Sequence, residues 1–335
     1  MKKLVLIDGV NFYYKGQWAA GKSYNFQGTD VTYVRCFLSN LLNMLKRLGK
    51  DGSELTCVVC WDAGYDERLR ISSKAVEEGI IPKAYKQDRR EARAMQDEED
   101  ALAAQRFVEQ MKVTQEVLKH TVVGQARIGG EEADDLVGSY AKKYAKDFDE
   151  VLLVTTDRDY YQLLEGNVRI YNSGKNEYKD ASFLKSEYNL DSGSQWVDVG
   201  ALAGESGAGG DTIYGVPGIG YTTAAKLIAK FGSLDNLLNT VENAIALDIK
   251  KFGGDALALC NAIKEKTYKL KTYQREAIVV AYKKVVLVAR QLKQMRTWLP
   301  VSLPETTPNW GALKAWCSDN AIPMREEDLA ILTEK

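Results

Sequence analysis

The sequence predicts an α/β fold with a mostly parallel central sheet and flanking helices, followed by a smaller helical lobe. Strand-like apolar runs and amphipathic helical patterns alternate through the first half of the chain, which is typical of βαβ units. Gly and Ser then cluster from residue 192 to 220, and mainly helical patterns follow. We therefore expect an α/β domain over residues 1–190 and a helical domain over residues 191–335.

Hydrophobic spacing predicts the individual elements. Continuous apolar runs indicate buried strands, and apolar residues at intervals of three and four indicate helices. The expected strands cover residues 4–7, 55–61 and 151–156. The expected helices cover residues 31–48 after a cap at Thr29 and Asp30, a segment that ends near His120 after a charged stretch over about 83–105, and residues 131–146. Such a sheet carries its ligand site beyond the carboxyl ends of its strands.

Composition excludes several classes of protein. The chain has 335 residues, of which 45% are hydrophobic and 27% are charged, as is ordinary for a globular protein. No apolar run approaches the ~18 residues of a membrane span, and the apolar start of the chain reaches Asp8 too soon for a signal peptide. We expect a cytoplasmic protein without a membrane partner.

Five cysteines and one histidine narrow the chemistry further. Cys57 and Cys60 form a Cys-x-x-Cys, but in a strand their side chains would point to opposite faces, so we interpret them as core residues. His120 is the only histidine of the sequence, which argues against a zinc site and against a Ser-His-Asp triad. Catalysis would therefore rest on carboxylates, lysines, arginines and metal ions.

The net charge of −1 conceals an uneven distribution. From Lys264 to Arg296 there are ten Lys or Arg residues and two Glu residues, which give this segment a net charge of +8. A basic face beside an acidic pocket is typical of enzymes that act on nucleic acids, whereas a solvated helix surface would be equally basic. Both interpretations of this segment stay open.

Acidic residues follow the expected strands at the point where each strand ends. Asp8 follows the first strand, Asp62 the second, and Asp157 with Asp159 the third. A further acidic group opens a helix after two glycines and comprises Glu132, Asp134 and Asp135. Any one of these acids could be a turn former or a helix cap. Together they predict one cleft of mutually repelling carboxylates, a repulsion that a hard cation such as Mg²⁺ or Mn²⁺ relieves.

Residues 16–23 satisfy the phosphate-loop pattern GxxxxGK[ST]. In a P-loop ATPase this loop leaves a strand at once and leads into a helix, whose N-terminus holds the phosphate. Here the first strand ends near Ile7, well before Gly16, and the residues after Ser23 suit a turn. The motif therefore gives only a weak alternative function.

Several segments are informative as a set, and they occur over roughly residues 4 to 240. They are LIDGVN (6–11), WDAGYDERLR…PKAYKQDRR (61–90), GGEEADD (129–135), TTDRDYYQLL (155–164), and ALAGES (201–206) with DTIYGVPGIGYTTAAKLIAKFGSLDNLL (211–238). In this order they resemble the flap-endonuclease and 5′–3′ exonuclease family, a PIN-like group of 5′-nucleases, of the stand-alone phage or bacterial type. The last of these segments resembles the family's helix–three-turn–helix.

The resemblance implies two metal-binding regions. The first would use Asp8, Asp62, Glu132, Asp134 and Asp135, and the second Asp157, Asp159, Glu205 and Asp211. Lys86 and Arg89 match the catalytic basic pair of the family's arch, here about residues 83–120, which faces the scissile phosphate and admits a 5′ single strand. The implied chemistry is phosphodiester hydrolysis with two Mg²⁺ or Mn²⁺ ions about 4 Å apart.

The resemblance also implies a set of DNA contacts, namely Arg68, Tyr85, Arg90, Gly218, Ile219, Gly220, Thr222 and Lys226. The tight turn over residues 216–220 has a physical reason for this role, because free backbone N–H groups before a helix accept a phosphate. Family members often hold a monovalent cation, here expected to be K⁺, on carbonyls of this element. An ordinary turn is the alternative interpretation.

One departure from the family's pattern concerns the second metal region. The family has Gly-Asp-x-x-Asp at this place, whereas here Asp211 follows Glu205 by six residues. We favour Glu205 as the ligand with a three-residue insertion, because its longer side chain would compensate for the altered spacing. Alignment without an insertion would put Ala208 in the ligand's place and imply a loosely held second metal ion.

Three functions follow as hypotheses. The first is a structure-specific 5′-nuclease, both exonuclease and flap endonuclease, that acts as a monomer on DNA with 5′ ends, flaps or junctions, and on RNA primers, in replication or repair. The second is a structure-specific DNA-binding protein of the same fold with weakened catalysis, and the third is a P-loop ATPase. We expect the first, and cleavage of a labelled flap substrate with Mg²⁺ separates it from the others.

Overall fold

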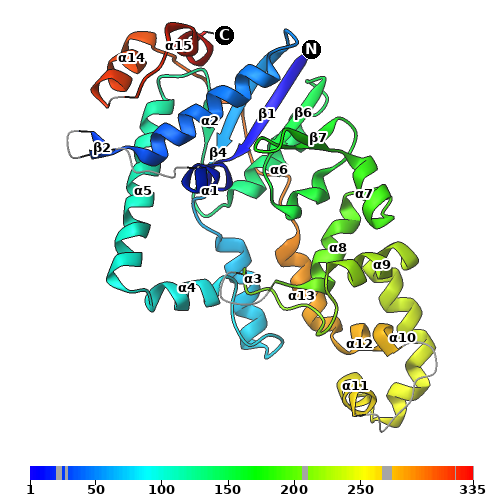
Figure 1. Cartoon of the computed structure of the whole chain (residues 1–335). Coiled ribbons are helices and arrows are strands. Elements are labelled where there is room, and N and C mark those ends of the chain that lie inside the picture. Colours follow the sequence, from blue (N-terminus) through cyan, green and yellow to red (C-terminus); the bar gives the residue numbers. More distant parts are fainter. Residues whose placement is uncertain (20–24, 27–28, 206–209, 266–273, 321, 335) are drawn as a thin grey trace. The chain divides into compact units, whose positions relative to one another are not determined.

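The computed structural model describes residues 1–19, 25–26, 29–205, 210–265, 274–320 and 322–334 (Figure 1). The chain divides into two compact units. The first, called the sheet unit, comprises Met1–Tyr65, Gln96–Asp180 and Met295–Lys335. The second, called the helical unit, comprises Asp66–Met95 and Ala181–Gln294. Both units are therefore built from segments that lie far apart in the sequence.

Within the described part of the sheet unit, six strands form one sheet in the order β5-β4-β1-β6-β7-β8. They are β1 (Lys2–Asp8), β4 (Glu54–Cys60), β5 (Gly124–Ala126), β6 (Glu150–Val154), β7 (Val168–Asn172) and β8 (Glu177–Lys179). Neighbouring strands are parallel except β7 and β8, so the predicted mostly parallel sheet is confirmed. A separate antiparallel ribbon joins β2 (Asn25–Phe26) to β3 (Thr29–Asp30).

β1 lies in the middle of the sheet because its apolar run can be buried on both faces. Residues 4–7 are completely buried, as expected for a strand that helices cover on both sides. β4 and β6 flank β1 in parallel register, so that Asp8 lies opposite Cys60 and Ile7 opposite Val154. The carboxyl ends of these three strands therefore meet at one edge of the sheet.

The helices of the sheet unit are α1 (Gly9–Ala19), α2 (Thr32–Leu48), α5 (Glu98–Leu118), α6 (Ala133–Tyr144), α14 (Trp310–Asp319) and α15 (Glu326–Thr333), with a 3₁₀ helix η1 (Arg158–Leu163). α2 and α6 lie where helices were predicted, and the side chain of Asp30 accepts the N–H of Thr32 at the start of α2. α5 begins inside the charged stretch, earlier than predicted, because Asp97 caps it by accepting the N–H of Asp100.

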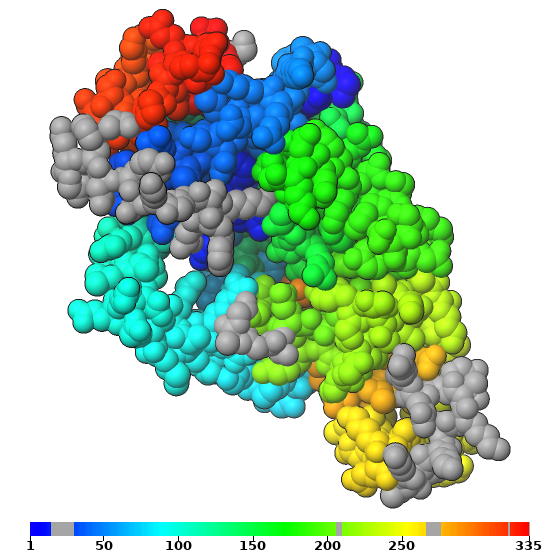
Figure 2. Space-filling model, in the orientation of Figure 1, coloured from blue at the N-terminus to red at the C-terminus, as the bar shows by residue number. Residues whose placement is uncertain are grey.

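The C-terminal helices complete the core of the sheet unit. Leu313 of α14 and Leu329 and Leu332 of α15 are buried in the same apolar cluster as the inner face of α2. The N–H of Val122, just before β5, donates to the carbonyl of Leu332. Figure 2 shows these last helices (red) lying against the N-terminal part of the chain (blue). The helices after residue 309 are therefore part of the sheet unit, although this segment carries little of the family resemblance.

The helical unit consists of α3 (Asp66–Glu77), α4 (Gln87–Ala94), α7 (Ala181–Tyr188), α8 (Ser194–Ala203), α9 (Tyr221–Phe231), α10 (Leu234–Lys251), α11 (Ala256–Lys264), α12 (Gln274–Ala281) and α13 (Lys283–Lys293). α8 packs against both α9 and α13. Arg68 of α3 is buried, and its Nε donates to the carbonyl of Leu292 in α13. No helix among the described residues has both the length and the apolar character that a membrane crossing requires.

This division differs in two places from the single boundary expected near residue 190. Residues 66–95, expected in the α/β domain, pack with the helical unit through contacts such as that of Arg68. Residues 295–335, expected in the helical domain, belong to the sheet unit, where α15 packs against α2 and α14 packs against α15. In both places the partner is distant in sequence, so local patterns could not reveal it. The arch region over about 83–120 contains α4 and α5, which belong to different units.

Candidate active site

Three acids stand at the carboxyl ends of adjacent strands in the sheet unit. Asp8 ends β1, Asp62 follows β4, and Asp157 follows β6. We call these three residues the carboxylate edge. Because β1 lies between β4 and β6, Asp8 is the central member, and it is partly buried, whereas Asp62 and Asp157 are exposed. The structure thus brings the strand-end acids to one edge, as parallel strands require.

Neutral groups hold both oxygens of the Asp8 carboxylate. Oδ1 accepts the backbone N–H of Asn11 at 3.0 Å, and Oδ2 accepts the hydroxyl of Tyr160 at 3.0 Å. Burial and then the charge of Asp62, with a smaller effect of Asp157, raise the pKa of Asp8 to about 7 despite these two hydrogen bonds. The carboxylate is therefore costly to ionise here unless a positive charge joins it.

Asp62 connects the end of β4 to the start of α6. Its Oδ1 accepts the N–H of Ala133 at 2.7 Å, in the manner of a helix cap. Beside it, the N–H of Ala63 donates to the carbonyl of Glu131 at 2.9 Å. These bonds place the acidic start of α6, with Glu132 and Asp134, next to the end of β4.

Asp157 also forms a local cap. Its Oδ1 accepts the N–H of Asp159 at 2.8 Å, at the start of η1. The neighbouring N–H of Thr156 donates to Oδ1 of Asn11 at 3.3 Å, so Asn11 links the ends of β1 and β6. The capping interpretation of these acids and their interpretation as ligands are thus compatible, because a cap fixes the direction of the carboxylate.

Asp135 differs from its neighbours because an arginine binds it. Asp135 is completely buried, and its Oδ1 accepts the backbone N–H of Arg296 at 2.7 Å. Its Oδ2 accepts Nη2 of the same arginine at 2.8 Å, and the guanidinium also binds Glu131. This geometry favours a positioning role for Asp135 over the predicted role as a metal ligand, since the cation that it neutralises is Arg296.

The acids converge but do not form a finished ligand set in this arrangement. In the part of the chain that the structure describes, no three His, Cys, Asp or Glu side chains are grouped closely enough to hold a metal ion. Mutual repulsion opposes a closer approach of the carboxylates when no cation lies between them. The oxygen donors at the carboxylate edge are nevertheless of the type that Mg²⁺ and Mn²⁺ prefer.

In the helical unit, Asp211 gathers the two predicted catalytic cations. Nη2 of Arg89 lies 2.9 Å from Oδ1 of Asp211, and Nζ of Lys86 lies 4.0 Å from the same oxygen. The hydroxyl of Tyr85 donates to Oδ2 at 3.1 Å. Lys86 is further held by its backbone, whose N–H donates to the carbonyl of Asp211 at 2.8 Å while its φ of +55° lies in the left-handed region. The predicted basic pair is thus confined to one place beside Asp211.

Glu205 pairs with a buried lysine. Nζ of Lys293 lies 2.6 Å from Oε2 of Glu205, and the lysine side chain is only 2% exposed. A buried ammonium needs a counter-charge, which Glu205 supplies. This pairing favours a structural role for Glu205 over the predicted role as a ligand, and it removes Lys293 from the basic surface considered for residues 264–296. Ala208, the alternative position, lies outside the described residues.

The turn between α8 and α9 has the features expected of a phosphate-binding hairpin. The N–H of Val216 donates to the carbonyl of Leu202 at 2.8 Å, which closes the turn against α8. Gly218 has a φ of +79°, which favours glycine, and a Cβ there or at Gly220 would meet nothing within 4 Å. The predicted contacts Gly218, Gly220, Thr222 and Lys226 are exposed. The side chain of Ile219 is buried, so this residue can offer only its backbone.

The remaining predicted DNA contacts differ in their surroundings. Arg90 is exposed. Arg68 and Tyr85 are only 4% and 3% exposed, so their side chains serve packing and hydrogen bonding within the helical unit. This burial favours a structural role for both over the predicted DNA contact, because a side chain that is almost completely buried cannot reach a phosphate.

Sequence reasoning missed three residues that organise the carboxylate edge. Asn11 and Tyr160 lie inside segments that resemble the family, and their polar side chains next to strand ends are the signal that could have found them. Arg296 has no local signal, because its partner Asp135 lies 161 residues away. The structure disfavours the P-loop alternative. Residues 16–19, which would begin the phosphate loop, belong instead to the helix α1, which follows β1 directly. Residues 20–23 lie outside the described residues.

Family comparison matches the chain in two segments. Residues 3–189 match the family described as 5′–3′ exonuclease, N-terminal resolvase-like domain. Residues 192–313 match the family described as 5′–3′ exonuclease, C-terminal SAM fold. A 5′–3′ exonuclease of Streptomyces coelicolor is 31% identical over 248 residues, which cover 71% of this chain and 75% of that protein. A 5′–3′ exonuclease of Buchnera aphidicola is 24% identical over 302 residues, which cover 90% of this chain and 89% of that protein.

Solved structures share the fold. The T5 5′-exonuclease has a TM-score of 0.65 at 20% identity and covers 99% of this chain and 100% of its own. Flap endonuclease-1 from Methanococcus jannaschii has a TM-score of 0.53 at 16% identity, with 99% and 91% covered. These likenesses confirm the predicted PIN-like sheet with a helical lobe. With two family matches in sequence order and strand-end acids at the edge that the family pattern predicts, the chain belongs to the 5′–3′ exonuclease family of nucleases.

Proposed function

We propose that this family member is a divalent-metal-dependent, structure-specific 5′-nuclease that hydrolyses DNA as a 5′–3′ exonuclease and a flap endonuclease. The carboxylate edge supports this proposal most. Three strand ends present acids at one place in a chain whose single histidine follows α5 and takes no part in the edge. Hydrolysis of a phosphodiester without histidine requires another source of positive charge and of an activated water, and metal ions supply both.

The residues present fit Mg²⁺ or Mn²⁺. A first ion would be held by oxygen ligands from Asp8, Asp62, Glu132 and Asp134, and a second by Asp157 and Asp159. When bound, such ions polarise the phosphate and lower the pKa of the attacking water. The raised pKa of Asp8 supports this assignment, since a bound cation offsets both causes of it, the burial of the carboxylate and the charge of Asp62. A structure of the T5 5′-exonuclease, which shares the fold, is described as holding divalent zinc ions.

The chain's own residues prepare the site for this chemistry. Asn11 and Tyr160 fix the two oxygens of Asp8, so the central carboxylate is oriented before the substrate arrives. Lys86 and Arg89 would neutralise the phosphate as it gains charge in the transition state. Their pairing with Asp211 restricts the rotamers of both cations and lowers the entropic cost of aligning them.

DNA binding is proposed for the helical unit. The exposed turn before α9 would accept a backbone phosphate without regard to sequence, and K⁺ on its carbonyls would strengthen that contact. A T5 flap endonuclease of similar fold has been solved with DNA and metal ions. Substrates with 5′ ends, flaps or junctions, RNA primers, a role in replication or repair, a cytoplasmic location and a monomeric state complete this proposal.

A cleavage assay tests the proposal directly. A 5′-labelled flap substrate is incubated with the full chain and Mg²⁺, with and without excess chelator, and a duplex with a 3′ flap serves as the matched control substrate. If the flap is cut near its junction, and if the chelator abolishes this cleavage, the result supports a metal-dependent 5′-nuclease. Cleavage that survives chelation, or equal cleavage of 3′ and 5′ flaps, would contradict it.

A second candidate is a structure-specific DNA-binding protein with weakened catalysis. The pairing of Glu205 with Lys293 favours it, because this carboxylate then contributes little to a second metal ion. This candidate predicts tight binding of the flap substrate with little or no cleavage at saturating Mg²⁺. Binding measured by anisotropy in Ca²⁺, followed by single-turnover cleavage in Mg²⁺, separates the two functions.

A further inference from the structure

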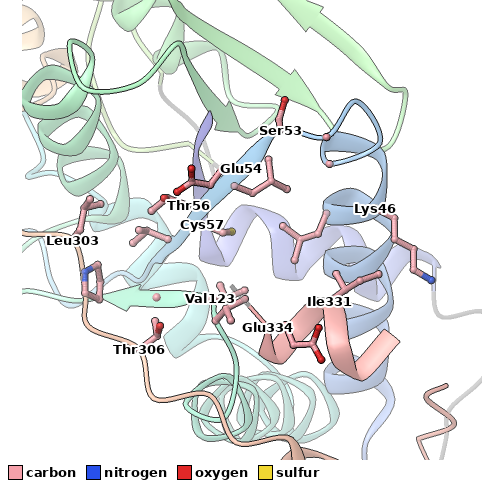
Figure 3. A pocket seen from close by; sticks show the side chains of 18 residues that line it. Lys46, Ser53, Glu54, Thr56, Cys57, Val123, Leu303, Thr306, Ile331 and Glu334 are labelled. Carbon is pink, nitrogen blue, oxygen red and sulfur yellow. The ribbon is translucent and has the colours of Figure 1, made fainter. Parts of the chain in front are cut away.

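An open groove runs along part of β4 in the sheet unit (Figure 3). It encloses about 830 Å³. Its walls come from α2 at Leu45, from residues 53–58 in and before β4, from the chain at Leu303 and Pro304, and from α15 at Ile331. The groove lies beside the amino-terminal half of β4, whereas Asp62 follows the carboxyl end of the same strand. It is therefore separate from the carboxylate edge.

The groove exposes an edge of the sheet. β4 pairs with β1 along its whole length, but β5 pairs only with residues 58–60 of β4. Among the described residues no strand lies beside residues 54–57 on that side. The N–H of Glu54 donates to the carbonyl of Met1, so alternation within a parallel ladder directs the backbone groups of Leu55 and Cys57 toward the groove. Such an edge is a template for another strand.

The two faces of β4 give the groove two different sides. Leu55 and Ile331 pack against the apolar cluster that contains Cys57 and Leu45, so this side is apolar. Figure 3 shows Glu54 and Thr56 on the other side of the strand, toward Leu303. A strand laid along this edge would therefore place its alternate side chains in an apolar and in a polar environment.

The rim of the groove carries negative charge. Glu54 and Glu334 both line it and are exposed. The one lysine of the lining, Lys46, is already paired with Asp328 of α15. A ligand that matches this rim carries basic residues, and the unequal sides of the groove require them to alternate with apolar ones.

We propose that this groove is a docking site for a short extended segment of a partner protein, which adds to the sheet as a strand beside Leu55 and Cys57. The segment alternates apolar residues, which face α2 and α15, with basic residues, which face Glu54, and it carries a further basic residue at the end that lies beside Glu334. Residues 54–57 span about 13 Å, enough for a core of four residues in the partner. Backbone hydrogen bonds give the affinity, and the alternating side chains give the specificity. The proposal is independent of the nuclease function.

Synthetic peptides test the proposal on the full chain. The probe is acetyl-Val-Lys-Val-Lys-Val-Lys-amide; its controls are a peptide of the same composition with all valines first and a version with alternate backbone nitrogens methylated. We expect the probe to bind and to slow amide exchange at Leu55 and Cys57 at least tenfold, because these N–H groups enter a new ladder. The N–H of Val59, which already faces β5, should not change. The methylated peptide should not bind.

Charge-reversal variants test the rim. Glu54→Lys with Glu334→Lys should weaken probe binding at least tenfold and leave flap cleavage unchanged, whereas Glu165→Lys with Glu187→Lys, an equal change at exposed positions elsewhere, should leave both unchanged. Equal binding of all three peptides, or no slowing at Leu55 and Cys57 at 1 mM probe, would overturn the proposal. A different result would be that amide exchange at Leu55 and Cys57 slows as the protein concentration rises in the absence of the probe. Together with a dimer in sedimentation, that result would mean that the occupant of the groove is a second copy of this chain and not a partner protein.

Discussion

Asp8 of the sheet unit and the predicted ligands of the helical unit meet different partners, whereas Asp135 of the sheet unit resembles the latter because Arg296 binds it. In the sheet unit, Asp8 accepts hydrogen bonds from a backbone N–H and a tyrosine hydroxyl, which are neutral. In the helical unit, Asp211 meets Arg89 and Lys86, and Glu205 meets Lys293. Neutral donors orient a carboxylate and leave its negative charge available to a metal ion, whereas a paired lysine or arginine neutralises that charge. The partner's charge therefore separates acids that are suited to bind metal from acids that are suited to hold the protein together.

The largest expected effect comes from the sheet unit. Asp157→Ala and Asp134→Ala should each lower flap cleavage by more than ~100-fold, because each removes a proposed metal ligand. Duplex binding, measured by anisotropy in Ca²⁺, should remain within a few-fold of the wild type. Asp191→Ala, an exposed acid of the helical unit, is the matched control and should cleave normally. Activity within a few-fold of wild type for both ligand variants would break the comparison.

Lys86→Ala tests the basic pair of the helical unit. We expect the single-turnover cleavage rate to fall by ~10–100-fold with little change in substrate affinity, because the lysine charge matters most in the transition state. Lys74→Ala, which removes an exposed lysine of α3, serves as the control. A loss confined to affinity, with the rate at saturating enzyme unchanged, would make Lys86 a binding residue.

The charge of Asp8 should appear as a pH dependence of stability. Its pKa is about 7 in the folded protein against an ordinary value of 3.8, so the folded state binds the proton more tightly than the unfolded state. As the pH rises from 5 to 7, the unfolding free energy of the metal-free protein should therefore fall by about 1 kcal/mol per pH unit because of this group. Urea denaturation in chelator, compared with Asp8→Asn, isolates the effect. Parallel pH profiles for the two proteins would refute it.

The smallest effect concerns Glu205 and Ala208. Glu205→Ala should lower the unfolding free energy by ~1–2 kcal/mol, because it leaves Lys293 buried without its counter-charge, and adding Lys293→Met should restore it. If pairing is the role of Glu205, the double variant keeps the wild-type Mg²⁺ dependence of cleavage, and Ala208→Asp raises cleavage at low Mg²⁺ by ~3–10-fold through a new oxygen donor. If the double variant needs a higher Mg²⁺ concentration for half-maximal cleavage than the wild type does, Glu205 is instead a metal ligand.

Local patterns were sufficient for the three central strands β1, β4 and β6 and for the acids at their ends, but they did not reveal the shorter strands β5, β7 and β8. The run at residues 4–7 and the aspartate that follows it are adjacent in the sequence, so both the strand and the position of Asp8 follow from periodicity. The roles of Arg68, Lys293 and Arg296 depend on partners more than 80 residues away, which no local pattern contains. For the same reason the basic residues of the segment 264–296 were all assigned to an exposed surface. In the structure Lys293 is buried, and Arg296 binds Asp135 and Glu131.

The packing of α15 on α2 also has a consequence for the folding of the chain during its synthesis. Most of the sheet leaves the ribosome before residue 180, and the helical unit before residue 295, but the apolar cluster stays open until Leu329 and Leu332 emerge. Arg296 likewise reaches Asp135 only late in translation. The apolar cluster under α2 can therefore close only after the segment up to Leu332 has been synthesised.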